Sequence, residues 1–198
     1  MLEQRAQQHF IDSADLGYQS AQALGQPVAA AIQALWVCVT GGNKVLCAAD
    51  AGAGALACYA ADQLAGRFER DRPGLSALAL DGAGSLVAAL AASAGAEAVQ
   101  AQQVRALGQP GDVLLLLTAD GQSSALMHAV EAAHEREMSV VALTGAGGGE
   151  LGRRLRETDV HVPVAHERIA RVRELHLLAL HALCDGIDAQ LLGEQEPS

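Results

Sequence analysis

Two short segments of this 198-residue chain combine glycine, hydroxyl and carboxylate groups that could bind a charged ligand. In residues 49–54 the candidates are Asp50 and Gly52. In residues 118–124 they are Thr118, Asp120, Gly121, Ser123 and Ser124. Glycines and backbone N–H groups at a helix N-terminus form a cradle for anions such as phosphate. A loop that only turns the chain has the same composition, so both interpretations stay open.

Each candidate loop follows an apolar run and precedes a stretch with helical spacing. Five such runs predict strands, at residues 44–48, 76–81, 112–118, 138–144 and 159–164. Their apolar residues are continuous rather than alternating, which is typical of strands buried on both faces of a parallel sheet. Ligands of open parallel sheets bind beyond the carboxyl ends of the strands, and this is where both loops fall.

The intervening segments predict the layers around the sheet. Helical spacing covers residues 53–67, 123–137 and 166–192. Residues 1–40 are also helical in character, with a break at Gly25–Pro27, so we expect a pair of N-terminal helices. The predicted fold is a doubly wound, flavodoxin-like α/β/α sandwich in one domain of residues 1–198, with its α/β core at 43–192.

Composition excludes several classes of function. A net charge of −10 without a basic stripe argues against nucleic-acid binding, and only 3% of the residues are aromatic. The four cysteines show no CxxC spacing, which favours buried reduced thiols over a metal or disulfide set. No run approaches 18 uncharged apolar residues, so we expect a cytoplasmic protein that is not bound to a membrane.

Longer motifs bring a specific resemblance. They are Asn43–Cys47, Gly66–Gly74, Gln103–Leu115, Val140–Gly145 and Arg173–Asp188. In register, these segments resemble the phosphoheptose isomerases of the sugar isomerase (SIS) family and their relative, the DnaA initiator-associating protein (DiaA). The resemblance implies a five-stranded parallel sheet and a homotetramer with sites between subunits. It also implies a reaction that converts a ketose phosphate, sedoheptulose 7-phosphate, to an aldose phosphate.

Both loops depart from the pattern of active isomerases. Where that pattern resembles Gly-Asn-Gly-Gly-Ser, this chain has residues 49–53, with Asp50 in place of the amide and Ala53 in place of the serine. In the second loop, Ala119 and Asp120 replace hydroxylated residues. A carboxylate about 4 Å from a phosphate costs roughly 1 kcal/mol in water and about 4 at an effective dielectric near 20. Weak binding of sugar phosphate is therefore expected.

The catalytic positions implied by the resemblance are also altered. The family's glutamate base aligns with Gln63, which cannot titrate, and its second histidine aligns with Tyr59. Its glutamine, which can bind zinc, aligns with Arg173, and only His181 is retained. One good ligand beside a cation does not make a zinc site, so we expect no metal and no cofactor.

These replacements predict a catalytically degenerate regulator similar to DiaA, which binds the replication initiator DnaA. The apolar pair Leu191 and Leu192 matches the place of a DnaA contact in that relative, although a plain packing pair fits equally well. Two alternatives stay open. One is an active phosphoheptose isomerase that uses His181, which could instead be a packed helix histidine. The other is a domain that binds sugar phosphate through the second loop, residues 118–124, without converting it.

Overall fold

A single parallel sheet forms the centre of the molecule. The computed structural model describes residues 1–50, 52–80 and 84–193, so Ala51 of the first loop and Asp81 of the second predicted strand lie outside it. The strand order is β2-β1-β3-β4-β5. The strands are β1 (Val45–Ala49), β2 (Ala77–Ala79), β3 (Val113–Thr118), β4 (Ser139–Thr144) and β5 (Val160–Pro163). The predicted five-stranded parallel sheet is confirmed.

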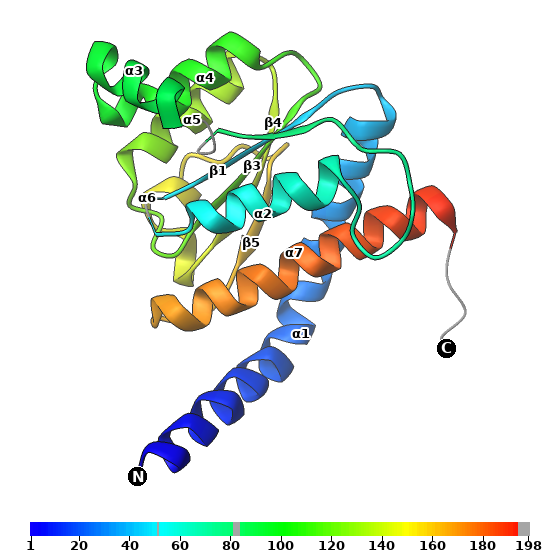
Figure 1. The fold of residues 1–198 in the computed structure, drawn as a ribbon, viewed down its shortest axis with the longest axis vertical. Helices are drawn as coiled ribbons and strands as arrows, with labels where there is room; N and C mark the ends of the chain where they lie inside the picture. The colour runs from blue at the N-terminus through cyan, green and yellow to red at the C-terminus, as the bar shows by residue number, and fades with distance from the viewer. Residues whose placement is uncertain (51, 81–83, 194–198) are drawn as a thin grey trace.

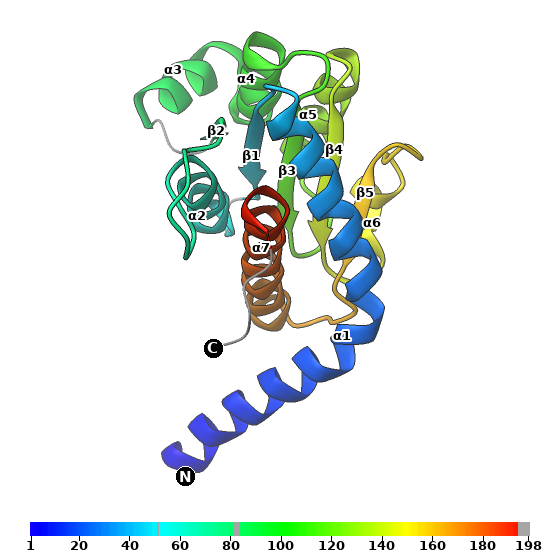
Figure 2. The same ribbon diagram turned by 90° about the vertical axis from the view of Figure 1, so that its right-hand side faces the viewer.

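Helices cover both faces of this sheet (Figure 1). They are α1 (Leu2–Thr40), α2 (Gly54–Ala65), α3 (Gly84–Ala94), α4 (Val99–Leu107), α5 (Ser124–Glu135), α6 (Gly149–Gly152) and α7 (Ile169–Leu192). Two short 3₁₀ turns, at 96–98 and 146–148, complete the set for the described residues. Figure 2 shows α1, α2 and α7 on one side of the strands, and α4 and α5 on the other.

Strand β3 shows why the apolar runs are continuous. Leu115 and Leu117 point into the core under α1, α2 and α7, whereas Leu114 and Leu116 point into the core under α4 and α5. All four side chains are at most 1% exposed. Because successive side chains of a strand point to opposite faces, a strand covered on both faces needs apolar residues at every position.

The N-terminal segment differs from the prediction. Instead of two helices broken at Gly25–Pro27, α1 is one helix of 39 residues with Pro27 inside it. Figure 2 shows that the helix changes direction partway along its length. Leu24 precedes the proline and Ala31 and Leu35 follow it, and all three are buried, so packing holds both halves together.

Helices α1 and α7 are also long and apolar enough, by length and composition, to cross a membrane. Helix α7 nevertheless buries Leu180, Leu183 and Ile187 against the sheet, as the core helix of a globular fold does. The inner half of α1 packs on α7 and β5 in the same core. Length and hydropathy alone do not separate such helices from membrane spans.

Candidate active site

The two predicted loops lie side by side at the carboxyl edge of the sheet. Strands β1 and β3 are parallel neighbours, with Ala49 paired to Leu117, so their ends meet. The backbone N–H of Asp50 continues the pairing by donating to the carbonyl of Leu117 over 3.1 Å. The loops after β1 and β3, which lie 68 residues apart in the sequence, therefore form one continuous surface at this edge of the sheet.

Asp50 joins the two loops through its side chain. One carboxylate oxygen, Oδ2, accepts a hydrogen bond from the backbone N–H of Ala119 over 3.2 Å. The other, Oδ1, accepts from the N–H of Gly52 over 3.4 Å, within its own loop. The carboxylate thus occupies backbone donors from both loops at once.

The second loop is a compact turn that leads into α5. The buried hydroxyl of Thr118 accepts from the N–H of Gly121 over 3.1 Å, and Ser123 caps α5 by accepting from Leu126 over 3.4 Å. The Asp120 carboxylate accepts from the N–H of Gln122 over 3.0 Å. The hydroxyl and carboxylate oxygens named in the prediction are therefore used to shape the loop, and Ser124 opens the helix behind it.

A glycine-rich turn supports this loop from below. Gly121 has a φ of +67°, and a Cβ added to it would lie 2.0 Å from the carbonyl oxygen of Gly148. The N–H of Leu151 also donates to the carbonyl of Gly121 over 3.0 Å. The close approach of the two backbones explains why only glycine fits at position 121.

Arg173 on α7 completes a cleft of about 380 Å³ above the loops. Its guanidinium lies over Gly52 so closely that a Cβ there would be 1.8 Å from Nη2. The same nitrogen is 3.9 Å from Oδ1 of Asp50. Other residues lining the cleft are Ala119, Asp120, Gln122, Ser123 and Ile169. A second cavity of about 350 Å³ extends from Asp50 and Ser123 toward α3 and α4.

Tyr59 and His181 form a second polar group, between α2 and α7. The phenol oxygen of Tyr59 lies 3.0 Å from Nε2 of His181, in a part-buried position. Phe68 packs on the imidazole with a ring separation of 5.7 Å. Gln63 follows Tyr59 by one helical turn and so lies on the same side of α2. The structure therefore brings three of the predicted catalytic positions to one region.

The residues at these positions do not fit a zinc ion. Nε2 of His181 is already hydrogen-bonded to a phenol, and the position of a further ligand carries the guanidinium of Arg173. Across the described residues, no group of three or more histidine, cysteine, aspartate or glutamate side chains could hold a metal.

His176 lies beneath the site and was not singled out as a site residue by the sequence. It is fully buried, and its Nε2 donates to the carbonyl of Thr144 over 3.1 Å. Burial lowers the pKa of His176, because the charged imidazolium would lose its hydration. Phe68 and Gln122 were also missed, since a single aromatic ring or amide carries no spacing signal.

Comparison with known proteins identifies the family of this chain. Residues 9–145 match the SIS domain family. The chain is 54% identical over 196 residues to a phosphoheptose isomerase of Methylibium petroleiphilum, covering 99% of this chain and 98% of the relative. It is 44% identical over 192 residues to that of Bordetella avium, covering 97% and 98%. The chain belongs to the phosphoheptose isomerase family of SIS-domain proteins.

Solved structures agree with this assignment. The phosphoheptose isomerase of Francisella tularensis superposes with a TM-score of 0.90 at 36% identity, covering 95% of this chain and 98% of that one. The phosphoheptose isomerase GmhA of Neisseria gonorrhoeae gives 0.88 at 37% identity, covering 96% and 100%. The fold and its helical N-terminus are thus those of phosphoheptose isomerases.

These findings overturn the prediction of a non-catalytic, DiaA-like regulator that binds DnaA. The full-length relatives carry the name of an enzyme, at identities of 39% to 54%. The prediction of no enzyme was wrong because it gave the replaced loop and catalytic residues more weight than similarity over the whole chain. The Leu191 and Leu192 pair also forms no single exposed patch: Leu191 packs against the core, and Leu192 is 40% exposed.

Proposed function

We propose that the protein is a phosphoheptose isomerase that interconverts sedoheptulose 7-phosphate and an aldose heptose 7-phosphate. The observation that carries this proposal is the full-length similarity to proteins of that name. The site geometry supports it by offering a cleft at the carboxyl edge of the sheet, lined by Arg173 of α7, and an acid–base pair between α2 and the same helix.

The reaction moves one hydrogen between neighbouring carbons and needs an acid and a base. A base removes a proton from C1 of the ketose while an acid protonates the carbonyl oxygen at C2, which gives an enediol. Returning a proton to C2 and releasing one from the oxygen at C1 gives the aldose. His181 is the base in this proposal, and the hydroxyl of Tyr59 is the acid. Gln63 does not titrate, so we assign it a hydrogen bond to substrate hydroxyls.

The pairing of Tyr59 with His181 suits this exchange. Their hydrogen bond keeps the imidazole in one orientation and lets a proton pass between the phenol and Nε2. The packing of Phe68 on the same ring limits its rotation. A positioned acid–base pair contributes about 10²- to 10⁴-fold to such a reaction.

The test of this proposal is to incubate the full chain with sedoheptulose 7-phosphate in D₂O. An enediol mechanism exchanges the transferred proton with solvent, so we expect an aldose product that carries deuterium at C2, detected by NMR and mass spectrometry. Binding of the sugar phosphate without any product or exchange would contradict the proposal and would favour a sensing domain.

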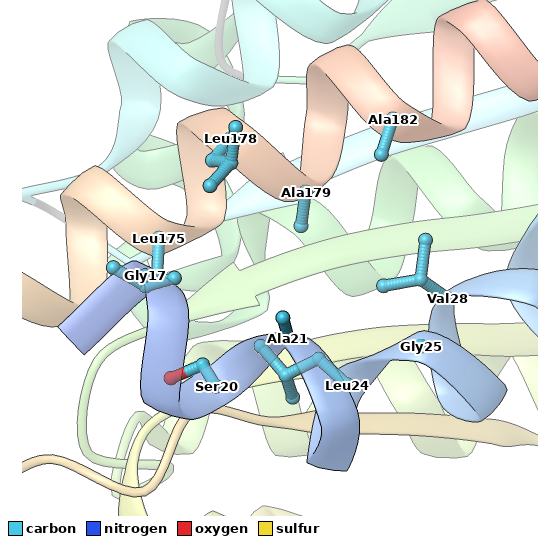
Figure 3. Close-up of a pocket in the computed structure, with 10 residues that line it drawn as sticks. All are labelled: Gly17, Ser20, Ala21, Leu24, Gly25, Val28, Leu175, Leu178, Ala179 and Ala182. Atoms are coloured by element: carbon cyan, nitrogen blue, oxygen red, sulfur yellow. The ribbon is translucent and has the colours of Figure 1, made fainter. Parts of the chain in front are cut away.

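We also propose that copies of the chain associate through α1, as a homotetramer. All residues from 1 to 11 are exposed, and this end of α1 projects from the body (Figures 1 and 2). Farther along, α1 and α7 enclose an apolar groove of about 190 Å³, lined by residues such as Ala21, Leu24 and Leu178 (Figure 3). An isolated helical end is marginal in water. Pairing of two copies would cover both features, because both belong to α1.

A cytoplasmic location is part of the same proposal. The four cysteines, all within the described residues, form no disulfide, which supports a reducing compartment. Burial raises the pKa of Cys38 to about 11 and that of Cys184 to about 12, so both are kept as unreactive thiols.

A further inference from the structure

Arg173 and Asp50 face each other in the cleft above the two loops. We propose that Arg173 is the anion-binding residue of the cleft, and that an incoming phosphate displaces the carboxylate of Asp50 from its donors. This inference rests on the proposed function, because it assigns the phosphate end of the same substrate.

The guanidinium of Arg173 has N–H donors that the described residues do not use. Within the described residues it makes no hydrogen bond: its nearest carboxylate oxygen, on Asp50, is 3.9 Å from Nη2, and its buried Nε has no partner. The side chain is 35% exposed and lines the cleft. A guanidinium carries five N–H donors in a planar fork that matches two phosphate oxygens at once. Arg173 is thus open to a ligand on the cleft side.

The guanidinium lies directly over the first loop. A Cβ added to Gly52 would lie 1.8 Å from Nη2, so a larger residue there would push the guanidinium away from the loop. Across the cleft lies the N-terminus of α5, a helix of 12 residues capped by Ser123. The partial positive charge of a helix N-terminus adds to the field of Arg173 and favours an anion between them.

Asp50 is an internal anion at the place where a ligand would bind. Its carboxylate accepts hydrogen bonds from the backbone of both loops, at Gly52 and Ala119, and it lies beside the guanidinium. Two backbone N–H groups and one guanidinium form a suitable donor set for a phosphate. A phosphate dianion carries more charge than a carboxylate, so it can compete for these donors.

The long distance between Asp50 and Arg173 makes it easier for a phosphate to take the place of the Asp50 carboxylate. Because 3.9 Å is too long for a hydrogen bond, a ligand does not have to break one to reach Arg173. Asp120 opposes the anion from the rim of the cleft, but it is exposed and bound to the N–H of Gln122. Asp50, which lies among the donors, is therefore the main competitor.

The test measures the affinity of the full chain for inorganic phosphate by calorimetric titration. Arg173→Gln should weaken binding by at least about tenfold, since it removes charge-assisted hydrogen bonds. Asp50→Asn should strengthen binding by about fivefold, the effect of one unit charge at roughly 4 Å in water. Arg168→Gln, which removes an exposed arginine near the start of α7, should leave affinity unchanged. Thermal unfolding without phosphate checks that each variant is folded.

Three results would overturn the inference: no phosphate binding by the wild type, wild-type affinity in Arg173→Gln, or equal or weaker binding in Asp50→Asn. A purely structural Asp50–Arg173 pair predicts that both changes weaken binding, so the opposite signs are the decisive feature. Phosphate binding that depends on Arg173, in a protein without turnover, would contradict the proposed function and leave this inference standing. Turnover with an unchanged KM in Arg173→Gln would support the proposed function and contradict the role of Arg173 in binding phosphate.

Discussion

Tyr59 and His181 are 122 residues apart in the sequence, yet α2 and α7 bring their side chains within 3.0 Å. Tyr59→Phe keeps the edge-on ring contact with His181 and removes only the hydroxyl. If the phenol is the acid, turnover of sedoheptulose 7-phosphate should fall by about 10²-fold while thermal stability changes little. Tyr18→Phe, at an exposed tyrosine of α1, is the matched control. Wild-type kcat in Tyr59→Phe would remove the phenol from the mechanism.

Buried histidines predict a pH dependence of stability. Burial lowers the pKa of His161 and of His176 below the ordinary value of 6.5. Between the lowered values and 6.5 the unfolded chain binds more protons than the folded one, so the free energy of unfolding falls as the pH drops below about 6.5. Urea unfolding at a pH above and a pH below that value measures this loss.

A double variant isolates the histidine contribution from the titration of the many acidic groups. His161→Gln with His176→Gln should reduce the loss of stability on acidification, whereas His128→Gln, at an exposed position on α5, should not. An unchanged pH dependence in the double variant would show that these two side chains do not couple protonation to folding.

At the scale of elements, the segment between α2 and β2 is tied to α7 by one buried arginine. Arg72 forms an ion pair with Asp188 over 2.5 Å, with both side chains at most 2% exposed. It also donates to the backbone carbonyls of Gln63 over 2.9 Å and Leu64 over 3.0 Å. Removing it would leave a buried carboxylate without its counter-charge.

Arg72→Ala should therefore lower the free energy of unfolding by about 3–5 kcal/mol in a denaturant titration. The control is Arg67→Ala in the same segment, whose ion pair with Asp71 is exposed and should contribute less than about 1 kcal/mol. Equal effects of the two substitutions would mean that the buried pair does not hold the segment in place.

The strands and the loop positions could be predicted from the sequence, whereas the course of α1 and the side-chain contacts of the site could not. Runs such as residues 113–118 identified the strands, because two-sided burial leaves a continuous apolar signal. The break at Pro27 was predicted wrongly, since tertiary packing of Leu24, Ala31 and Leu35 outweighs the local cost of a proline. Loop positions were predicted from topology. The Asp50 contact with Ala119 and the unpartnered Nε of Arg173 depend on how side chains are placed in the fold. The spacing of residues in the sequence could not predict them.

At the scale of the whole molecule, the projecting end of α1 predicts self-association. Light scattering after size exclusion should give about four times the 20.3 kDa of one chain. Combining Phe10→Glu with Leu178→Glu puts charges on the exposed apolar surface of α1 and α7, and should reduce that mass. Leu107→Glu, on α4, is the control. A monomeric wild type, or an unchanged mass in the double variant, would contradict assembly through this surface.

We propose that this chain, despite its altered loops, is an isomerase that uses His181. The most direct test is kcat/KM for sedoheptulose 7-phosphate in the wild type, His181→Ala and His128→Ala, with aldose product measured directly. We predict turnover by the wild type, a loss of at least about 10²-fold in His181→Ala and no change in His128→Ala, because this exposed histidine lies on α5 and not on α2 or α7. No product from the wild type at high enzyme concentration would show that the chain is not this isomerase, and full activity in His181→Ala would exclude His181 as its base.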